Sequence, residues 1–134
     1  MTDNLFVSYR ADDEGNQYKN LLVAWANNPN KTFYDVKFYD TSVGIAINSK
    51  DADYIKKVIK ERINSSKKVL VLVGENTSRS EWVEWEIEKA HALGKQLVAV
   101  KINNSYTSPD AIFGKNAKWA KSFTYESIKK ALED

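Results

Sequence analysis

Two hydrophobic periodicities alternate along the chain. Short apolar or alternating runs, typical of strands, are separated by stretches with apolar residues at helical spacing. The strands are predicted at 5–9, 33–39, 69–73, 97–102 and near 122–123. Residues 69–73 are all apolar, which predicts a central parallel strand covered on both faces, whereas 33–39 alternates and predicts a less buried strand.

Four helices are predicted between and after these strands. The first begins after Gly15, Ser49 or Asp51 can cap the second, and Ser80 can cap the third, which Gly94 ends. Their apolar stripes are Tyr18, Leu21, Leu22 and Trp25; Ile55, Val58, Ile59 and Ile63; Val83, Ile87 and Ala90; and Tyr125, Ile128 and Leu132. Segment 103–121 is the hardest to assign, with one helical turn predicted at 109–113.

This order of elements predicts an α/β fold with helices on both faces of an open, mostly parallel sheet. Five strands favour the flavodoxin-like three-layer sandwich with strand order 2-1-3-4-5. A length of 134 residues is that of one domain, which we expect to span 1–134.

Composition limits the classes of partner and site. A net charge of +2 is too small to indicate nucleic acid or an acidic membrane. There is no cysteine for a disulfide or a thiolate metal site, and the one histidine, His91, excludes a histidine-rich metal cluster. With no leader-like segment and no apolar run approaching about 18 residues, we expect a soluble, cytoplasmic protein without a membrane partner.

One acidic residue of the third helix is out of place. At about 100° per residue, Glu86 falls on the inward apolar arc with Trp82 and Val83. The opposite side, predicted to face water, carries Glu81, Glu84, Trp85 and Glu88. Glu86 is therefore either a helix-edge side chain that reaches solvent or pairs with a basic residue, or a carboxylate presented into a pocket.

The predicted topology gathers other polar residues near the same place. In doubly wound sheets, ligands bind outside the carboxyl ends of the strands, beside the first strand. This places Ser8, Tyr9 and Arg10, Asp40, and the segment 74–77 around one crevice, into whose rim the Glu86 helix opens. We expect Glu86 to line a cleft shared with residues 8–10.

Two families of this layout do not fit the residues. A phosphorelay receiver needs an acceptor aspartate where strand 69–73 ends, but Gly74 follows that strand. A flavodoxin needs a phosphate-binding loop after the first strand, but the loop 10–15 carries three acids that would repel phosphate. No GxGxxG or GxxxxGK[ST] motif occurs.

The segment Phe6-Val7-Ser8-Tyr9, with Asp13 following, resembles the opening motif of TIR domains, and 80–87 resembles their Ser-x-Trp-Cys-x-x-Glu-Leu segment. The chain looks most similar to the short TIR-like, NAD-processing proteins of bacterial Thoeris antiphage defence. Val83 and Ile87 stand in place of the motif's Cys and Leu and keep its helix face apolar. The loop 40–48 lacks a proline common in signalling TIR domains and so departs from their pattern.

The resemblance implies an NAD+ glycohydrolase or cyclase with Glu86 as the catalytic residue, NAD+ as substrate, and no cofactor. A carboxylate can hold ribose hydroxyls and stabilise an oxocarbenium ion without a metal or a histidine. The residues predicted to contact substrate are Ser8, Tyr9, Arg10 (at the pyrophosphate), Trp82, Asp40 and Thr77.

The product, linear ADP-ribose or a cyclic ADP-ribose-type signal, stays open. The resemblance also implies self-association or a TIR-like partner for activity, with Trp85 as a candidate interface anchor, and a separate effector that reads the product. The alternatives are a non-catalytic TIR-like interaction module, since one fold serves both roles, and an unrelated nucleotide-binding regulator.

Overall fold

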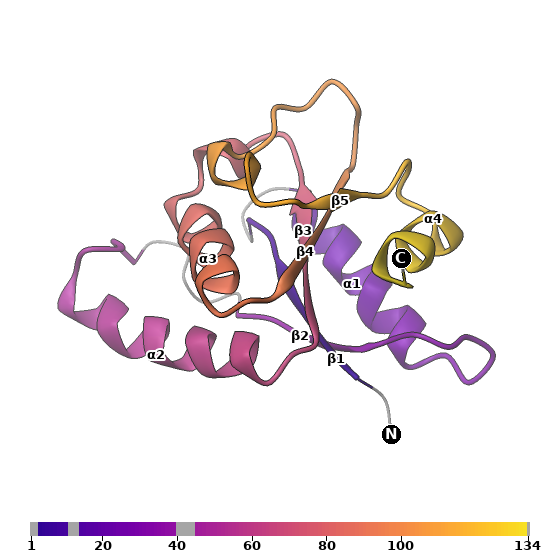
Figure 1. The fold of residues 1–134 in the computed structure, drawn as a ribbon, viewed down its shortest axis with the longest axis horizontal. Coiled ribbons are helices and arrows are strands. Elements are labelled where there is room, and N and C mark those ends of the chain that lie inside the picture. Colours follow the sequence, from indigo (N-terminus) through magenta and orange to yellow (C-terminus); the bar gives the residue numbers. More distant parts are fainter. Residues whose placement is uncertain (1–2, 11–13, 40–44, 134) are drawn as a thin grey trace.

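A parallel sheet forms the centre of the computed structural model, which describes residues 3–10, 14–39 and 45–133. Its strand order is β2-β1-β3-β4-β5, and all neighbouring strands are parallel (Figure 1). The five strands are β1 (Asn4–Ser8), β2 (Asp35–Lys37), β3 (Lys68–Val73), β4 (Gln96–Lys101) and β5 (Lys118–Trp119). The predicted fold class and strand order are confirmed, with β3 in the middle.

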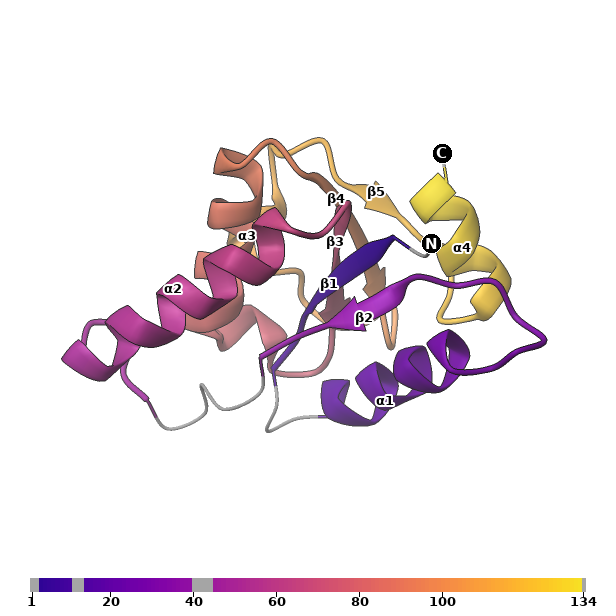
Figure 2. The ribbon, with the colours of Figure 1, turned by 90° about the horizontal axis from the view of Figure 1, so that it is seen from below.

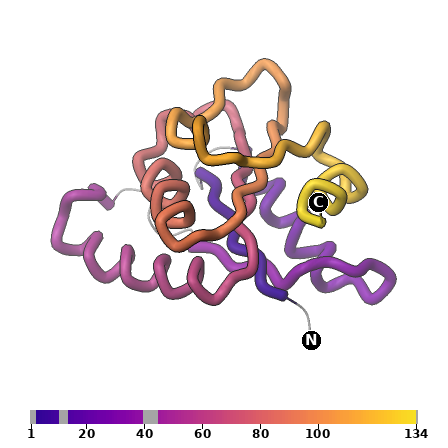
Figure 3. Tube along the Cα trace, viewed as in Figure 1, coloured from indigo at the N-terminus to yellow at the C-terminus, as the bar shows by residue number. Residues whose placement is uncertain are grey.

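Helices cover both faces of this sheet and complete three layers. They are α1 (Gly15–Ala26), α2 (Lys50–Asn64), α3 (Glu81–Ala92) and α4 (Tyr125–Glu133). Figure 2 shows α2 and α3 on one side of the strands and α1 and α4 on the other, and the chain trace in Figure 3 follows the same crossovers. The carboxyl ends of the strands therefore open between two helix layers.

Each face of the sheet has its own core. Val69, Val71 and Val73 of β3 pack with α2 and α3, whereas Leu70 and Leu72 pack with α1 and α4. Successive strand residues point to opposite faces, so a strand buried on both sides has no place for a polar residue. This explains the uninterrupted apolar run.

Short polar signals set the ends of α2 and α3. The Ser80 hydroxyl accepts a hydrogen bond from the Val83 N–H at 3.2 Å, and the Ser49 hydroxyl accepts one from the Ala52 N–H at 3.3 Å. Gly94 follows α3 with φ +75°, a conformation that costs glycine little. These three predicted boundaries are confirmed.

Two predicted strands need correction. β2 has three residues rather than seven, and the last strand lies at Lys118–Trp119 rather than near 122–123. Residues 122–124 instead lie directly before α4, and the Thr124 hydroxyl accepts a hydrogen bond from the Ser127 N–H in the first turn at 3.2 Å. The turn predicted at 109–113 is present as a 3-10 helix, η2 (Asp110–Ile112).

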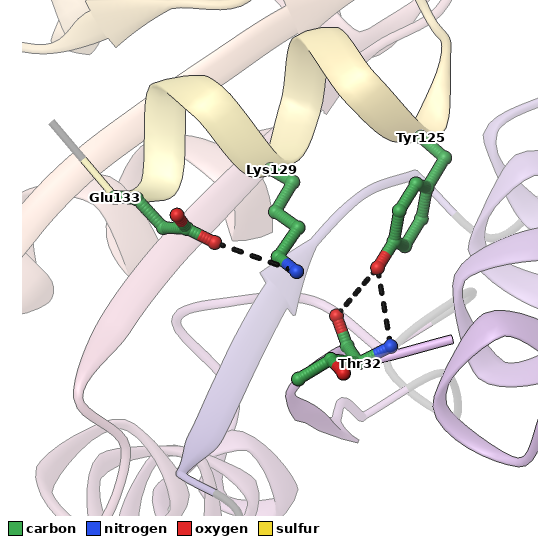
Figure 4. Close-up of polar contacts among 4 residues, drawn as sticks. All are labelled: Thr32, Tyr125, Lys129 and Glu133. Carbon is green, nitrogen blue, oxygen red and sulfur yellow. Dashed lines mark hydrogen bonds and ion pairs between the residues drawn. The ribbon is translucent and has the colours of Figure 1, made fainter. Parts of the chain in front are cut away.

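Tyr125 fastens α4 to the segment before β2, as Figure 4 shows. Its hydroxyl donates to the Thr32 carbonyl at 2.7 Å and accepts from the Thr32 N–H at 3.2 Å. Its ring meets Trp25 edge-on at 5.5 Å, within an aromatic cluster on the α1/α4 face. One turn further on, Lys129 and Glu133 form an ion pair at 3.7 Å.

Candidate active site

Glu86 lies on the buried face of α3, directly over the end of β1. It is 4% exposed, and its Oε1 accepts a 2.7 Å hydrogen bond from the hydroxyl of Ser8, which is fully buried. Among the described residues it forms no ion pair with a lysine or arginine. The helical spacing thus predicted the face correctly, and Glu86 does not reach outward into water.

This environment changes the acidity of Glu86. Burial raises the pKa of its carboxyl to about 8, although the hydrogen bond from Ser8 lowers it. Removal from water disfavours the charged form, and a hydrogen bond to that form restores only part of the loss. In the absence of a ligand, Glu86 is therefore mostly protonated at neutral pH, and a nearby positive charge would favour its ionisation.

The carboxylates on the outer side of α3 have different roles. Glu81 and Glu88 are exposed, as predicted, but Glu84 is half-buried and its Oε2 accepts from the Ala111 N–H at 2.8 Å. Glu88 pairs with Lys115 at 3.0 Å. The prediction that Glu84 faces water was wrong, because the segment after β4 folds onto α3 and uses this carboxylate as an anchor.

Two tryptophans precede Glu86 on α3. Trp82 donates from its indole N–H to the Ile45 carbonyl at 2.9 Å. A groove of about 370 Å³ borders it, lined by residues 45–48, Glu81 and Trp82. Trp85 is partly buried against the α2/α3 core, with its ring 6.2 Å from that of Trp82. Its predicted position among solvent-facing residues was wrong, because α2 packs beside it.

The end of β1 divides the predicted ligand contacts between two faces. Tyr9 is 6% exposed and packs in the α1/α4 core, on the opposite side of the sheet from Ser8 and Glu86. Arg10 extends toward the loop after β3, where its guanidinium donates to the Asn76 carbonyl at 3.1 Å. Of residues 8–10, only Ser8 meets Glu86 in the described contacts. Substrate contact by these residues stays a prediction.

Thr77 and Asp40 complete the predicted set. Thr77 is fully buried in the 3-10 helix η1 (Thr77–Arg79) after β3. Its hydroxyl accepts from the Gly74 N–H at 2.8 Å and donates to the Leu72 carbonyl at 3.3 Å, which closes the loop on itself. Asp40 lies outside the described residues. A role in substrate binding remains a prediction for both.

One notable residue was missed by sequence reasoning. Lys19 of α1 is 5% exposed, and its ammonium lies 4.0 Å from the centroid of the Phe38 ring and 5.6 Å from that of Tyr9. The signal was its spacing: Gly15, Lys19 and Leu22 are at i, i+4 and i+7, and all three are buried. A lysine on the inward stripe of a helix is the same kind of exception as Glu86.

The described residues contain neither a metal-binding cluster nor a helix that could span a membrane. Residues 3–10, 14–39 and 45–133 hold no group of three or more histidine, cysteine or acidic side chains arranged to bind a metal ion. Over the same residues, no helix combines the length and apolarity needed to cross a membrane.

Comparison with known proteins decides the family. A family model described as "Thoeris protein ThsB, TIR-like domain" matches residues 6–107. The chain belongs to this family. The match includes the end of β1, α3 and the hydrogen-bonded pair Ser8 and Glu86, so the TIR-like family covers the site as well as most of the sheet.

A curated relative and two solved structures place this TIR-like chain further. A protein of Cytobacillus dafuensis named "Putative cyclic ADP-D-ribose synthase TIR2" is 32% identical over 53 residues, which are 40% of this chain and 14% of that protein. The chain thus matches about a seventh of the relative's length.

The CMP N-glycosidase BcmB of Clostridium botulinum superposes with a TM-score of 0.62 at 13% identity, covering 98% of this chain and 99% of that one. A 2-deoxyribosyltransferase of Bacillus psychrosaccharolyticus gives 0.56 at 12%, covering 78% and 77%. At these identities, the likeness establishes the fold alone.

Proposed function

We propose that this TIR-like chain cleaves the nicotinamide–ribose bond of NAD+ in bacterial antiphage defence, with Glu86 as the catalytic carboxylate. The observation that carries the proposal is the buried pair of Glu86 and Ser8 at the carboxyl end of β1. Membership of the Thoeris ThsB family supports it, as does the name of the cyclic ADP-D-ribose synthase relative. NAD+ is substrate rather than cofactor.

The chemistry needs one ionised carboxylate beside the ribose. When the C–N bond breaks, its electron pair leaves with the ring nitrogen as neutral nicotinamide, and positive charge develops on the ribose as an oxocarbenium ion. The Glu86 carboxylate stabilises that charge. Water then attacks the anomeric carbon and loses a proton to give ADP-ribose, or another atom of the same molecule attacks to give a cyclic product.

Substrate charge and Glu86 ionisation are linked in this proposal. The nicotinamide ring of NAD+ carries a positive charge, which would lower the pKa of a neighbouring carboxyl. Substrate binding therefore favours loss of the proton that burial retains on Glu86. At neutral pH, the cation of the substrate thus favours the ionised form that the reaction needs.

Access to Glu86 involves Trp82, one helical turn earlier. The indole N–H of Trp82 donates a hydrogen bond to the Ile45 carbonyl, and Trp82 lines the neighbouring groove. Glu86 is not among the residues that line that groove. We propose that the ribose reaches Glu86 when the indole and the segment 45–48 separate. Self-association is the proposed trigger, and a separate effector reads the product.

A test with matched variants addresses the reaction. NAD+ consumption and products are measured at high protein concentration by chromatography with mass detection. Glu86→Gln keeps the shape but removes the charge, so turnover should fall by at least about 100-fold. Glu61→Gln, an exposed change on α2, is the control and should have no effect. Undiminished cleavage by Glu86→Gln would exclude this mechanism.

The near-complete burial of Glu86 favours one second candidate, a non-catalytic TIR-like interaction module. A carboxyl that is 4% exposed can serve the fold alone through its bond to Ser8. The same assay separates the two functions, because a module would leave NAD+ intact at every protein concentration while still associating with a TIR-like partner.

A further inference from the structure

Lys19 is a buried cation that the proposed reaction does not use. A lysine commonly lays its stem along the protein and keeps its ammonium in water, but an exposure of 5% leaves little room for that arrangement. The Phe38 and Tyr9 rings lie beside the ammonium. Among the residues that the structure describes, no carboxylate forms an ion pair with it.

The energetics of this arrangement favour an anionic ligand. A buried ammonium without a counter-ion is costly. The two aromatic faces recover part of that cost through cation–π attraction, but they offer no lone pair to its three N–H donors. An anion bound beside Lys19 would supply both the opposite charge and the missing acceptors.

The position of Lys19 indicates which anion. Tyr9 follows β1 directly and Phe38 follows β2, so the two rings and Lys19 lie at the carboxyl ends of these strands, on the α1 side of the sheet. Glu86 lies at the end of the same strand β1, on the α3 side. A ligand over this end of β1, where the strand order reverses, therefore borders both groups, and Arg10 follows Tyr9 at the same strand end.

We propose that Lys19, enclosed by Phe38 and Tyr9, is an anion subsite that binds the pyrophosphate of a dinucleotide whose ribose lies at Glu86. The identity of the ligand rests on the proposed function. In NAD+ the pyrophosphate is joined through one methylene group to the ribose that bears nicotinamide. The proposal therefore requires the pyrophosphate subsite at Lys19 to adjoin the ribose subsite at Glu86.

The test uses ADP-ribose, which contains the pyrophosphate but needs no cleavage. It is titrated by calorimetry, at one fixed salt concentration, into the wild type and into Lys19→Gln, Lys19→Arg and Lys57→Gln. Loss of a charge-assisted contact should weaken binding to Lys19→Gln by about 10- to 100-fold. Lys19→Arg should retain most of the affinity, and the exposed control Lys57→Gln should match the wild type.

The outcomes separate this inference from the proposed function. Equal affinity in folded Lys19→Gln, or no binding of ADP-ribose by the wild type, overturns the subsite. Binding that depends on Lys19 without any NAD+ cleavage keeps the subsite and overturns the proposed reaction. If Lys19→Gln does not fold, inorganic pyrophosphate is competed against ADP-ribose on the wild type, and absence of competition overturns the subsite.

Discussion

At the scale of single residues, the protonation of Glu86 makes a pH prediction for catalysis. The free protein holds this carboxyl with a pKa of about 8, and the proposed reaction needs its ionised form. The value of kcat/KM for NAD+ should therefore rise about tenfold per pH unit up to about pH 8 and then level off. A profile that is flat from pH 6 to pH 9 would contradict an ionising Glu86.

Ser8→Ala tests the hydrogen bond in that pair. The Ser8 hydroxyl lowers the pKa of Glu86, so its removal should shift the rising limb of the kcat/KM profile to higher pH. Ser66→Ala is the matched control, because Ser66 is also buried but its hydroxyl donates to the Arg62 carbonyl. A loss of activity at every pH, with no shift of the limb, would assign Ser8 another role.

The pH dependence of the unfolding free energy should also report the pKa of Glu86, without any assay of activity. The folded-state pKa of about 8 lies above the ordinary value of 4.5, so the folded protein binds the proton more tightly than the unfolded chain between these values. The wild type should then lose up to about 1.4 kcal/mol of unfolding free energy per pH unit across this window, relative to Glu86→Gln.

The difference between Glu86→Gln and wild type is expected to be constant below about pH 4.5, to change between the two pKa values and to reach a second plateau above about pH 8. Denaturant unfolding of both proteins at several pH values measures it. An unchanging difference from pH 5 to pH 8 would show that Glu86 is already ionised in the free protein.

At the scale of elements, the N-terminal cap of α3 contributes measurably to stability. The Ser80 hydroxyl accepts from the Val83 N–H at the start of α3, so Ser80→Ala should lower the unfolding free energy by about 1 kcal/mol. Ser49→Ala at the start of α2 has the same geometry and should cost about as much. If activity falls only in Ser80→Ala, the cap also sets the position of Glu86.

For Trp85, the structure predicts a role in stability, whereas the helical wheel favoured an exposed interface residue. Because it packs against the α2/α3 core beside Trp82, Trp85→Ala should destabilise the fold by about 2 kcal/mol or more. Thermal unfolding measures this loss, and sedimentation compares association in the two proteins. A variant of unchanged stability that associates less would return Trp85 to the role of an interface anchor.

The elements that sequence reasoning predicted well are those with a strong periodic signal. The all-apolar β3 and the stripe of α3 need no knowledge of their neighbours, because burial on two faces or one already dictates the pattern. The two-residue β5 has no periodicity to detect. Glu84 and Trp85 were wrongly predicted to face water because a helical wheel considers one helix without its neighbours. In the structure, α2 and the segment that follows β4 both cover the outer side of α3.

The positions of the candidate site residues were only partly predictable from the sequence. The buried position of Glu86 could be predicted because a carboxylate on an apolar arc breaks the helical pattern. Ser8 and Tyr9 point to opposite faces of the sheet because successive strand residues alternate. The predicted crevice grouped them together because it was defined only by where the strands end. Lys19 carried the same signal as Glu86 and could have been found by it.

At the scale of the whole molecule, we expect the chain to self-associate weakly. The exposed large apolar side chains of the described region lie on α1, α2, the segment after η2 and β5: Leu21, Tyr54, Phe113 and Trp119. Such dispersed anchors favour weak association. We expect a mostly monomeric chain whose NAD+ cleavage per molecule rises with concentration. Sedimentation and rate measurements over a hundredfold concentration range test this, and a constant specific rate would contradict it.

The paired indoles at the start of α3 also give the molecule a built-in optical probe. The Trp82 and Trp85 rings lie 6.2 Å apart at an interplanar angle of 73°, close enough for their excited states to couple. Trp82 is also tied through its N–H to the segment at Ile45. Separation of that segment on ligand entry would change the near-ultraviolet circular dichroism and the tryptophan emission, so occupancy of the site can be followed without a label.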